Sequence, residues 1–425
     1  MKFVLTVIVM GWLFLGCKPR NNPIPIKKPF VPVYKNCDST LKVLWQRPVL
    51  KDTAIVFSSL YDVDDNLIYN IEPFKDLPLP ELGFFTFKNL EIEFIAKFEE
   101  DKENKIYVFN NSRQKITVNN EILSYTDGRN LYGFSKNAQF LWKSSFNDEQ
   151  GVGGGAPFLS SYKNFVYYPS LGYEVFASDY LFKVNINTGV KQQIFTEPRK
   201  DSLINFIDPP VGFELNGDEM LAFQIRKHSF AKYYNQADFM VYNVTKNKML
   251  WRRDSLDRYG FGSANQPLYE NNKIYYASSF DLNCLDVTTG KMLWRQSFEN
   301  YPYELNFSNL LLTEEGLIVH SNAREMSLLD KNTGKIIWEN RSIGSGPKQL
   351  TYYKGDLIFN NFGTGTLECV NVKSGLLKWS AKSPYNCQHS GAHYGINEFV
   401  IDPKTNQLYI CDNFFYYCLK LPGYD

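Results

Sequence analysis

Short apolar stretches separated by turn residues recur along most of the chain. Five segments of 11 residues align without gaps, and each reads as an apolar strand, a polar turn and a second strand that ends in tryptophan. A sixth segment, 183–193, fits the pattern with Gln193 in the place of the tryptophan. This pattern predicts two antiparallel strands joined by a tight turn. The five segments are 132–142, 241–251, 284–294, 328–338 and 369–379.

The turns inside these segments carry residues that suit a sharp chain reversal. Asp286, Asp330 and Asn371 begin three of them, where a short polar side chain can hydrogen-bond the backbone. Glycine follows at the position where a hairpin turn needs a positive φ. We expect that role for Gly189, Gly290, Gly334 and Gly375.

The tryptophans divide the chain into units of similar length. From Trp251 onward, successive tryptophans lie 43, 44 and 41 residues apart. Two more short strands precede each of these segments, so one unit holds four strands in about 40–45 residues, as a propeller blade does. A large indole on the last strand can wedge against the neighbouring sheet. We expect this docking role for Trp45, Trp142, Trp251, Trp294, Trp338 and Trp379.

The count of units predicts how the fold closes. After Trp379 the chain supplies only three further strands, and a fourth is available at 41–46. Pairing that strand with 415–421 would leave no open sheet edge. We therefore expect an all-β fold, an eight-bladed β-propeller of four-stranded antiparallel blades closed by the N-terminal strand. Seven blades with an extra element is the alternative.

The first 36 residues differ from the rest, with six basic side chains and no acidic one. Their apolar run, 3–15, is too short to span a bilayer and has the length of a signal-peptide core. It ends in Leu-Gly-Cys, so we expect a signal peptide at 1–16 and lipidation of Cys17; a plain secretory signal is the alternative. Five prolines make 17–36 an extended tether, which could lie along anionic lipid or act as a simple spacer. The propeller is expected at 37–425.

Composition excludes some classes of protein. With 46 basic and 45 acidic side chains, the chain has no overall basic field, so nucleic acid is not an expected partner. Hydrophobic residues make up 44%, which is enough for a large core and too much for a disordered chain. The expected partners are therefore proteins, and a membrane through the lipid.

Few residues suggest chemistry. Cys387, His389 and His393 are close in sequence, but no second pair completes four zinc ligands, so we expect a polar loop and no metal. Cys411 and Cys418 fall on consecutive expected strands. They could form a cross-strand disulfide in an exported protein or remain thiols, and strand register decides between the two.

The repeated segments resemble the tryptophan-docking motif of PQQ-type propellers, Ala-x-Asp-x-x-Thr-Gly-x-x-x-Trp, over nearly all of residues 41–425. With the Leu-Gly-Cys ending, the chain resembles BamB-like propeller lipoproteins of the outer-membrane β-barrel assembly machinery. This resemblance implies a non-enzymatic scaffold that binds envelope proteins, anchored in the outer membrane and facing the periplasm, with the cell surface as the alternative. A glycan-binding propeller is the competing function.

Quinoprotein dehydrogenases resemble this fold as well, and they carry a calcium site, a catalytic aspartate and usually an adjacent Cys-Cys pair. The sequence contains no Cys-Cys dipeptide, and every tryptophan after Trp12 takes a docking position. We therefore expect no catalytic residues and no cofactor.

The links between blades are rich in glycine and serine. They recur at equivalent positions and would surround the central channel, where binding loops are common. The alternative is that small residues only allow close packing near the axis. The candidate binding residues are Gly153, Gly154, Gly155, Gly262, Ser263, Gly344, Ser345, Gly346, His389 and His393.

Overall fold

The computed structural model separates the chain into two units, Met1–Asn36 and Cys37–Asp425. All described residues lie in the second unit. They are 41–48, 57–63, 66–72, 81–86, 92–97, 116–119, 122–126, 130–135, 140–146, 159–170, 179–198, 203–229, 234–256, 265–298, 307–321, 326–341, 343, 350–361, 363–387, 392–394, 399–412 and 414–424.

Across these residues the strands form eight antiparallel sheets. The first four in chain order are β2 (Phe57–Val63), β3 (Asn66–Glu72), β4 (Glu81–Thr86) and β5 (Ile92–Lys97); β6 (Ile116–Asn119), β7 (Ile122–Thr126), β8 (Asn130–Ser135) and β9 (Phe140–Ser145); β10 (Ser160–Tyr162), β11 (Phe165–Ser170), β12 (Tyr180–Asn185) and β13 (Lys191–Thr196); and β14 (Ile204–Ile207), β15 (Val211–Leu215), β16 (Asp218–Ser229), β17 (Tyr234–Asn243) and β18 (Lys248–Arg253).

The other four sheets follow the same order. They are β19 (Leu268–Glu270), β20 (Lys273–Ala277), β21 (Asp281–Asp286) and β22 (Met292–Ser297); β23 (Phe307–Leu312), β24 (Leu317–Ser321), β25 (Met326–Leu329) and β26 (Ile336–Asn340); β27 (Leu350–Tyr353), β28 (Asp356–Asn361), β29 (Thr366–Asn371) and β30 (Leu377–Ala381), which a short 3₁₀ helix follows (Pro384–Cys387); and β31 (Phe399–Asp402), β32 (Gln407–Cys411) and β33 (Phe415–Lys420) with β1 (Val43–Pro48).

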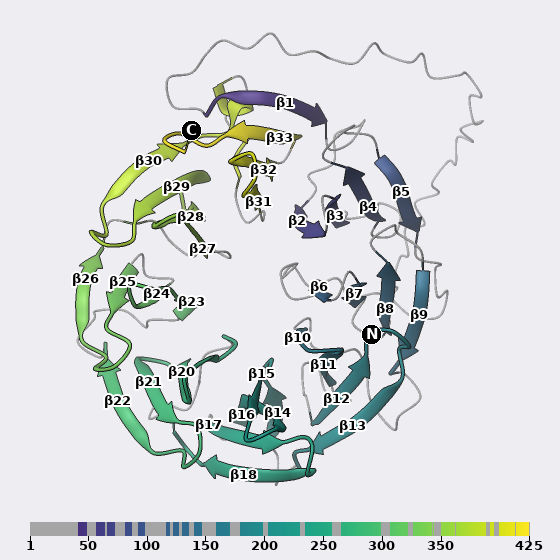
Figure 1. Ribbon diagram of the computed structural model, residues 1–425, viewed down its shortest axis with the longest axis vertical. Coiled ribbons are helices and arrows are strands. Elements are labelled where there is room, and N and C mark those ends of the chain that lie inside the picture. The colour runs from purple at the N-terminus through teal and green to yellow at the C-terminus, as the bar shows by residue number, and fades with distance from the viewer. Residues whose placement is uncertain are drawn as a thin grey trace, which may run out of the picture. The chain divides into compact units, whose positions relative to one another are not determined.

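Within the second unit, the sheets follow one another around a common centre (Figure 1). In β6–β9 and β27–β30, for example, the first strand lies toward the centre and the last lies at the rim; in the sheet that contains β1, β31 lies toward the centre and β1 at the rim. Inner strands of neighbouring sheets contact each other, as β15 does with β19 and β23 does with β27. This is the architecture of an all-β propeller built from four-stranded antiparallel blades, as the repeat predicted.

The last sheet combines strands from both ends of the second unit. β1 pairs with β33, so that Trp45 lies opposite Cys418 and Pro48 lies opposite Phe415. The backbone N–H of Lys420 also donates to the carbonyl of Lys42 at 2.9 Å. The sheet order is therefore β1-β33-β32-β31, with the N-terminal strand outermost.

The hydrophobic core is divided among the boundaries between sheets. In the sheets from β10 onward, neighbouring sheets cover both faces of the middle strands, which are largely buried and read as mostly apolar runs. All five residues of β24 are buried, for example. One cluster joins Leu131 and Trp142 of one sheet to Phe182 and Val184 of the next. The core therefore depends on contacts between blades as much as on pairing within them.

A β-bulge in each outer strand was not predicted from the sequence. In all eight sheets the pairing of the outer strand shifts by one residue. In the sheet β19–β22, Cys284 pairs with Trp294 and Leu285 pairs with Met292, which leaves Leu293 as the extra residue. A bulge increases the local twist and redirects side chains. Here it points tryptophan toward the next blade and the residue before it outward.

Candidate functional site

Four tryptophans join consecutive blades through one repeated set of contacts. The indole N–H of Trp294 donates to the carbonyl of Lys331 at 3.0 Å, and its ring lies against Gly334. A Cβ built on Gly334 would lie 2.5 Å from the indole, so only glycine fits beneath the ring. The same contacts join Trp142 to Ile186 and Gly189, Trp251 to Val287 and Gly290, and Trp338 to Val372 and Gly375.

The turns that receive these rings are fixed by local hydrogen bonds. Asp286 accepts the backbone N–H groups of Thr288 and Thr289 at 3.1 and 2.8 Å. The N–H of Gly290 donates to the carbonyl of Asp286 at 2.9 Å, with a φ of 66° at the glycine. Each of the four predicted turn glycines has a positive φ. The turn chemistry expected from the sequence therefore forms the surface on which the indole lies.

The two other predicted docking tryptophans have different surroundings. Trp379 is partly buried and packs against the core of the last sheet, and its indole nitrogen has no hydrogen-bond partner among the described residues. Trp45 lies on β1, with its ring 5.9 Å from that of Tyr409. Among the residues that the structure describes, neither makes the full set of tryptophan–carbonyl–glycine contacts.

The boundary between sheets β10–β13 and β14–β18, here called the charged seam, is built differently. Gln193, which takes the tryptophan place in the sequence repeat, has an exposed side chain. In the other segments the extra residue of the bulge directly precedes the tryptophan. In β13 it is instead Ile194, which follows Gln193 and is only 6% exposed. Ile194 packs with Phe195 against the sheet β14–β18. The alignment of Gln193 with tryptophan is thus wrong in three dimensions, because the displaced bulge turns a different residue inward.

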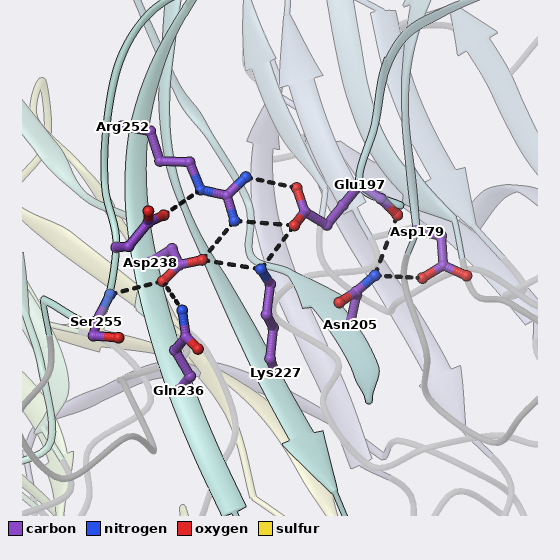
Figure 2. A network of polar contacts seen from close by, with 9 residues as sticks. Asp179, Glu197, Asn205, Lys227, Gln236, Asp238, Arg252 and Ser255 are labelled. Atoms are coloured by element: carbon purple, nitrogen blue, oxygen red, sulfur yellow. Dashed lines mark hydrogen bonds and ion pairs between the residues drawn. The ribbon is translucent and has the colours of Figure 1, made fainter. Parts of the chain in front are cut away.

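Four charged side chains meet at this seam (Figure 2). The Nζ of Lys227 lies 2.8 Å from Glu197 Oε1 and 3.1 Å from Asp238 Oδ2. Arg252 donates to both carboxylate oxygens of Glu197, at 2.8 and 2.9 Å, and also to Asp238. Glu197 follows β13, whereas the other three belong to β16, β17 and β18. The network therefore joins the two blades, and Arg252 also donates to the exposed carboxylate of Asp254 at 2.9 Å.

The partners in the network set the charge of each member. Burial alone would raise the pKa of Glu197, but hydrogen bonds from Arg252 and Lys227 lower it below its usual value. Burial likewise opposes ionisation of Asp238, and hydrogen bonds led by that from Arg252 lower its pKa. The pKa of Arg252 is raised, since Glu197 and Asp238 outweigh the effect of burial. Removing any one member would leave an opposite charge poorly paired in a buried place.

Neutral groups complete the network. The side-chain amide of Asn205 donates to Asp179 at 2.9 Å and to the carbonyl of Glu197 at 3.2 Å. Asp238 accepts further hydrogen bonds from Gln236 and from the backbone N–H of Ser255. These contacts, drawn in Figure 2, hold both carboxylates in fixed positions.

The other end of the charged seam is also ionic. Lys183 lies 2.8 Å from Glu219, which accepts a hydrogen bond from Tyr167 as well. In other blades the third-strand residue opposite tryptophan is small or apolar, as Cys284 is. Lys183 aligns with that position in the repeat, so charge is present where the other boundaries use an indole.

The network lies at the base of the longest hairpin. β16 and β17 pair from Met220–Asn243 to Ser229–Tyr234. In the next blade the equivalent pairs run from Lys273–Asp286 to Ala277–Leu282. The hairpin therefore continues for five residues beyond its neighbour, or about 16 Å at the usual rise per residue. We call Ile225–Ser229 and Tyr234–Asp238 the extended hairpin.

A third strand and a second ion pair support the extended hairpin. β14 pairs with its first strand, from Ile204 opposite His228 to Ile207 opposite Ile225. Arg226 donates to both oxygens of Asp208, with contacts of 2.7 and 2.9 Å. Burial raises the pKa of Asp208, against the opposing effect of Arg226. The repeat predicted four strands per blade, and the sequence did not indicate these buried ion pairs; the missing tryptophan at 193 was the available signal.

The cysteine alternatives are decided by register. Cys411 lies opposite Tyr416, and Cys418 lies opposite Tyr409, so the two cysteines do not face each other. Both are thiols, and the disulfide alternative is wrong. Burial raises the pKa of Cys418 to about 12, which makes its thiol unreactive.

Most of the other predicted site residues lie outside the described residues. His393 is described; it is exposed and packs against Gly365. Within the described ranges, no three His, Cys, Asp or Glu side chains gather as metal ligands. No helix among those residues has the length and apolarity needed to cross a membrane. The undescribed candidates are Cys17, Gly153, Gly154, Gly155, Gly262, Ser263, Gly344, Ser345, Gly346 and His389.

Comparison with known proteins adds to this geometry. A family model described as outer membrane protein assembly factor BamB matches residues 238–411. BamB from Moraxella catarrhalis has a similar structure, with 12% identity and a TM-score of 0.56 over 91% of this chain and 99% of that one. The chain has the β-propeller fold of this structure, and residues 238–411 are similar to the PQQ-like repeats of the family model. A search of curated protein sequences finds no match.

Other propellers are equally similar in fold. A europium-containing methanol dehydrogenase has 12% identity and a TM-score of 0.60 over 87% of this chain and 84% of that one. Sqt1 from Saccharomyces cerevisiae has 9% identity and a TM-score of 0.60 over 90% of this chain and all of that one. Because an assembly factor and an enzyme share this architecture, the function of the propeller must be argued from its own residues.

Proposed function

We propose that this propeller is a lipid-anchored, non-enzymatic scaffold that binds another protein of an outer-membrane envelope, in membrane-protein assembly or secretion. The match of residues 238–411 to the BamB family model carries the proposal. The matched region includes three of the four complete tryptophan–glycine contacts, through Trp251, Trp294 and Trp338. In these blades the recurring residues build a rigid ring, which suits a scaffold.

The extended hairpin is the surface that we propose for the protein partner. It breaks the symmetry of the repeat, because its two strands continue past those of the next blade. Its base is held by Lys227, Asp238 and the Arg226–Asp208 pair. Ile225, Lys227, Ala237 and Asp238 are buried, so a partner would contact the strand residues beyond them, and a rigid base lowers the ordering cost of that contact.

Shortening the extended hairpin tests this proposal. Replacing residues 229–234 by Asn-Gly would keep His228 opposite Asn235 and suits a two-residue turn. We expect this variant to retain its melting temperature and to lose cross-linking to the β-barrel protein of the assembly machinery in intact cells. A Val190→Ser variant, altered at an exposed position in the turn before β13, serves as the matched control. Equal cross-linking of the wild type and the shortened variant would overturn the assignment of this surface.

The number of blades and the way the ring closes are part of the same proposal. We infer eight blades, with the eighth completed by β1, because β1 extends the sheet of the last three strands. Truncation up to Asn36 should leave the melting temperature nearly unchanged. Truncation up to Gln46 removes most of β1, exposes a sheet edge and should lower the melting temperature markedly. Equal melting temperatures for the two truncated proteins would contradict closure by this strand.

Anchoring at Cys17 accounts for the envelope location in this proposal. The supporting feature is the apolar run that ends in Leu-Gly-Cys. Intact mass spectrometry of membrane-extracted protein should show acyl groups, and Cys17→Ser should release the protein from the membrane. An unmodified wild-type protein in the soluble fraction would rule the anchor out. Protease access in intact cells distinguishes a periplasmic location from the cell surface.

The absence of catalysis is also a proposal. All six tryptophans of the second unit lie on outer strands, at the rim and away from the centre where a quinone would be held. Titration with PQQ and calcium, followed by dye-linked oxidation of alcohols and sugars, tests it. Tight stoichiometric binding with turnover would replace the scaffold by an oxidoreductase.

A further inference from the structure

Exposed apolar side chains are concentrated on the outer strands. Among the described residues, every large hydrophobic side chain recorded as exposed lies on an outer strand or directly before one. Ile337 is 53% exposed, Leu376 66% and Leu377 51%. The others are Leu44, Phe140, Leu141, Val190, Met249, Leu250 and Leu293. Among the residues whose burial is described, the exposed large apolar side chains therefore gather at the rim.

The bulge explains the position of several of these side chains but not their chemistry. Leu293 and Ile337 are the extra residues of β22 and β26, so the fold turns them outward. In β30 the extra residue is Lys378, which shows that a charged side chain is compatible with the same geometry. The aliphatic residues elsewhere are thus not required by the fold, and a contact at the rim would account for them.

The part of the rim that includes β1, the described strand closest in sequence to the tether, combines these apolar residues with positive charge. We define the rim arc as the exposed residues of β26, β30 and β1 and of the turns that lead into them. Its apolar members are Ile337, Leu376, Leu377 and Leu44, and its exposed lysines are Lys335, Lys373, Lys378 and Lys42. Arg341 pairs with Glu339, and Lys378 pairs with Asp356 at 2.6 Å, so the positive charge of the arc comes from Lys335, Lys373 and Lys42. The arc is therefore basic as well as apolar.

The structure argues against an added β-strand as the occupant of the rim arc. A bulge interrupts each of the three outer strands, and lysines flank the apolar positions; both features prevent edge-to-edge strand pairing. A lipid surface requires no hydrogen-bond register, and exposed aliphatic side chains beside lysines are suited to the headgroup region of anionic lipid. β1 begins seven residues after the tether, which itself has five basic residues.

We infer that the rim arc binds an anionic lipid surface, so that the propeller lies edge-on to the membrane near its tether. This inference rests on the proposed anchor only for the choice of this part of the rim. On the β18 part of the rim, Arg252 is engaged in the charged seam and Arg253 donates to the carbonyl of Gly290. Lys248 is exposed there beside Met249 and Leu250, and Lys246 pairs with Asp218, so the two parts of the rim are distinguished by their distance along the chain from the tether.

Vesicle sedimentation tests the inference on a chain that begins at Lys18. This chain lacks Cys17 and the apolar run but keeps every described strand and core cluster. Phosphatidylglycerol–phosphatidylethanolamine vesicles and neutral phosphatidylcholine vesicles are compared at low salt. We expect binding to the anionic vesicles only. An Ile337→Ser, Leu377→Ser double variant should lose about tenfold in partition coefficient. Lys42→Gln with Lys335→Gln should lose about 25-fold, at roughly fivefold for each charge.

A Met249→Ser, Leu250→Ser double variant on β18 is the matched control and should bind like the parent chain. Circular dichroism and melting temperature establish that each variant is folded. Equal loss in the β18 control, or no binding of the parent chain to anionic vesicles, would overturn the inference. Failure of lipidation at Cys17 would leave this assay unaffected, because the assayed chain has no Cys17, so the two proposals fail separately.

Discussion

The charged seam and the boundary between β19–β22 and β23–β26 join neighbouring blades with different chemistry. At the second boundary, Trp294 lies on Gly334 and donates to a backbone carbonyl, in a core of apolar side chains. At the charged seam, Ile194 and Phe195 fill the centre, and ion pairs lie at both ends. At the charged seam, ion pairs and apolar packing therefore take the place of the indole, and the four-strand blade still forms.

The comparison also shows why glycine and tryptophan occur together. Asn247 aligns with the turn glycines and has a φ of 51°, but no indole from the preceding blade lies on it. Its side chain instead accepts a hydrogen bond from Tyr242 at 2.6 Å. Glycine is required where a ring covers the turn, and asparagine is sufficient where none does. The two positions thus vary as a pair across a boundary between blades.

Truncation of the docked indole should have the largest effect. Trp294→Ala removes a side chain that is only 8% exposed, and we expect the free energy of unfolding to fall by about 4 kcal/mol. Leu293→Ala, at the exposed residue beside it, is the control and should change stability by less than about 0.5 kcal/mol. Urea unfolding measures both. Similar small losses would show that the indole does not hold the blades together.

Removing one charge from the charged seam should lower the free energy of unfolding somewhat less than Trp294→Ala does. Lys227→Met leaves Glu197 and Asp238 with Arg252 as their remaining cation in the network, and we expect a loss of about 3 kcal/mol. Lys163→Met breaks an exposed pair with Glu214 and should leave the free energy of unfolding nearly unchanged. If the two variants have the same melting temperature, the buried network contributes no more to stability than a surface ion pair.

Sequence reasoning predicted the parts of the fold that depend on local pattern. Turn residues such as Asp286 and Gly290 and the periodic tryptophans are local signals, so the four-strand unit followed from them. The bulges and the charged seam are not local. Glu197 and Arg252 are 55 residues apart, and their contact depends on how two sheets lie against each other. Gln193 was assigned the docking place because alignment cannot detect that the bulge in β13 has moved to Ile194.

Exchanging the turn residues, glycine at one boundary and asparagine at the other, should change stability less. Only the glycine-to-asparagine variant should be destabilised. Gly334→Asn places a side chain under the Trp294 ring, and overpacking should cost about 2 kcal/mol. Asparagine tolerates positive φ, so most of this loss is steric. Asn247→Gly should change stability by less than about 0.5 kcal/mol. Differential scanning calorimetry of both variants tests the pairing rule, and equal losses would contradict it.

At acid pH the charged seam should lose its ionic contribution to stability, whereas the tryptophan boundary should not. The pKa values of Glu197 and Asp238 are lowered in the folded protein, so their stabilising contribution is complete above the unfolded values near pH 4 and is lost as pH falls through the folded values. Asp208 has a raised pKa and acts in the opposite direction, because its folded state takes up a proton more readily.

The stability difference between the wild type and Glu197→Gln should therefore be large at pH 7 and shrink below pH 4, where Glu197 becomes protonated and resembles glutamine. The difference between the wild type and Trp294→Ala should stay constant over the same range, since the indole does not titrate. Urea unfolding of the three proteins from pH 7 to pH 3 provides the comparison, with the Asp208 contribution common to all. A Glu197→Gln difference that does not change with pH would mean that the seam is held by its apolar centre and not by charge.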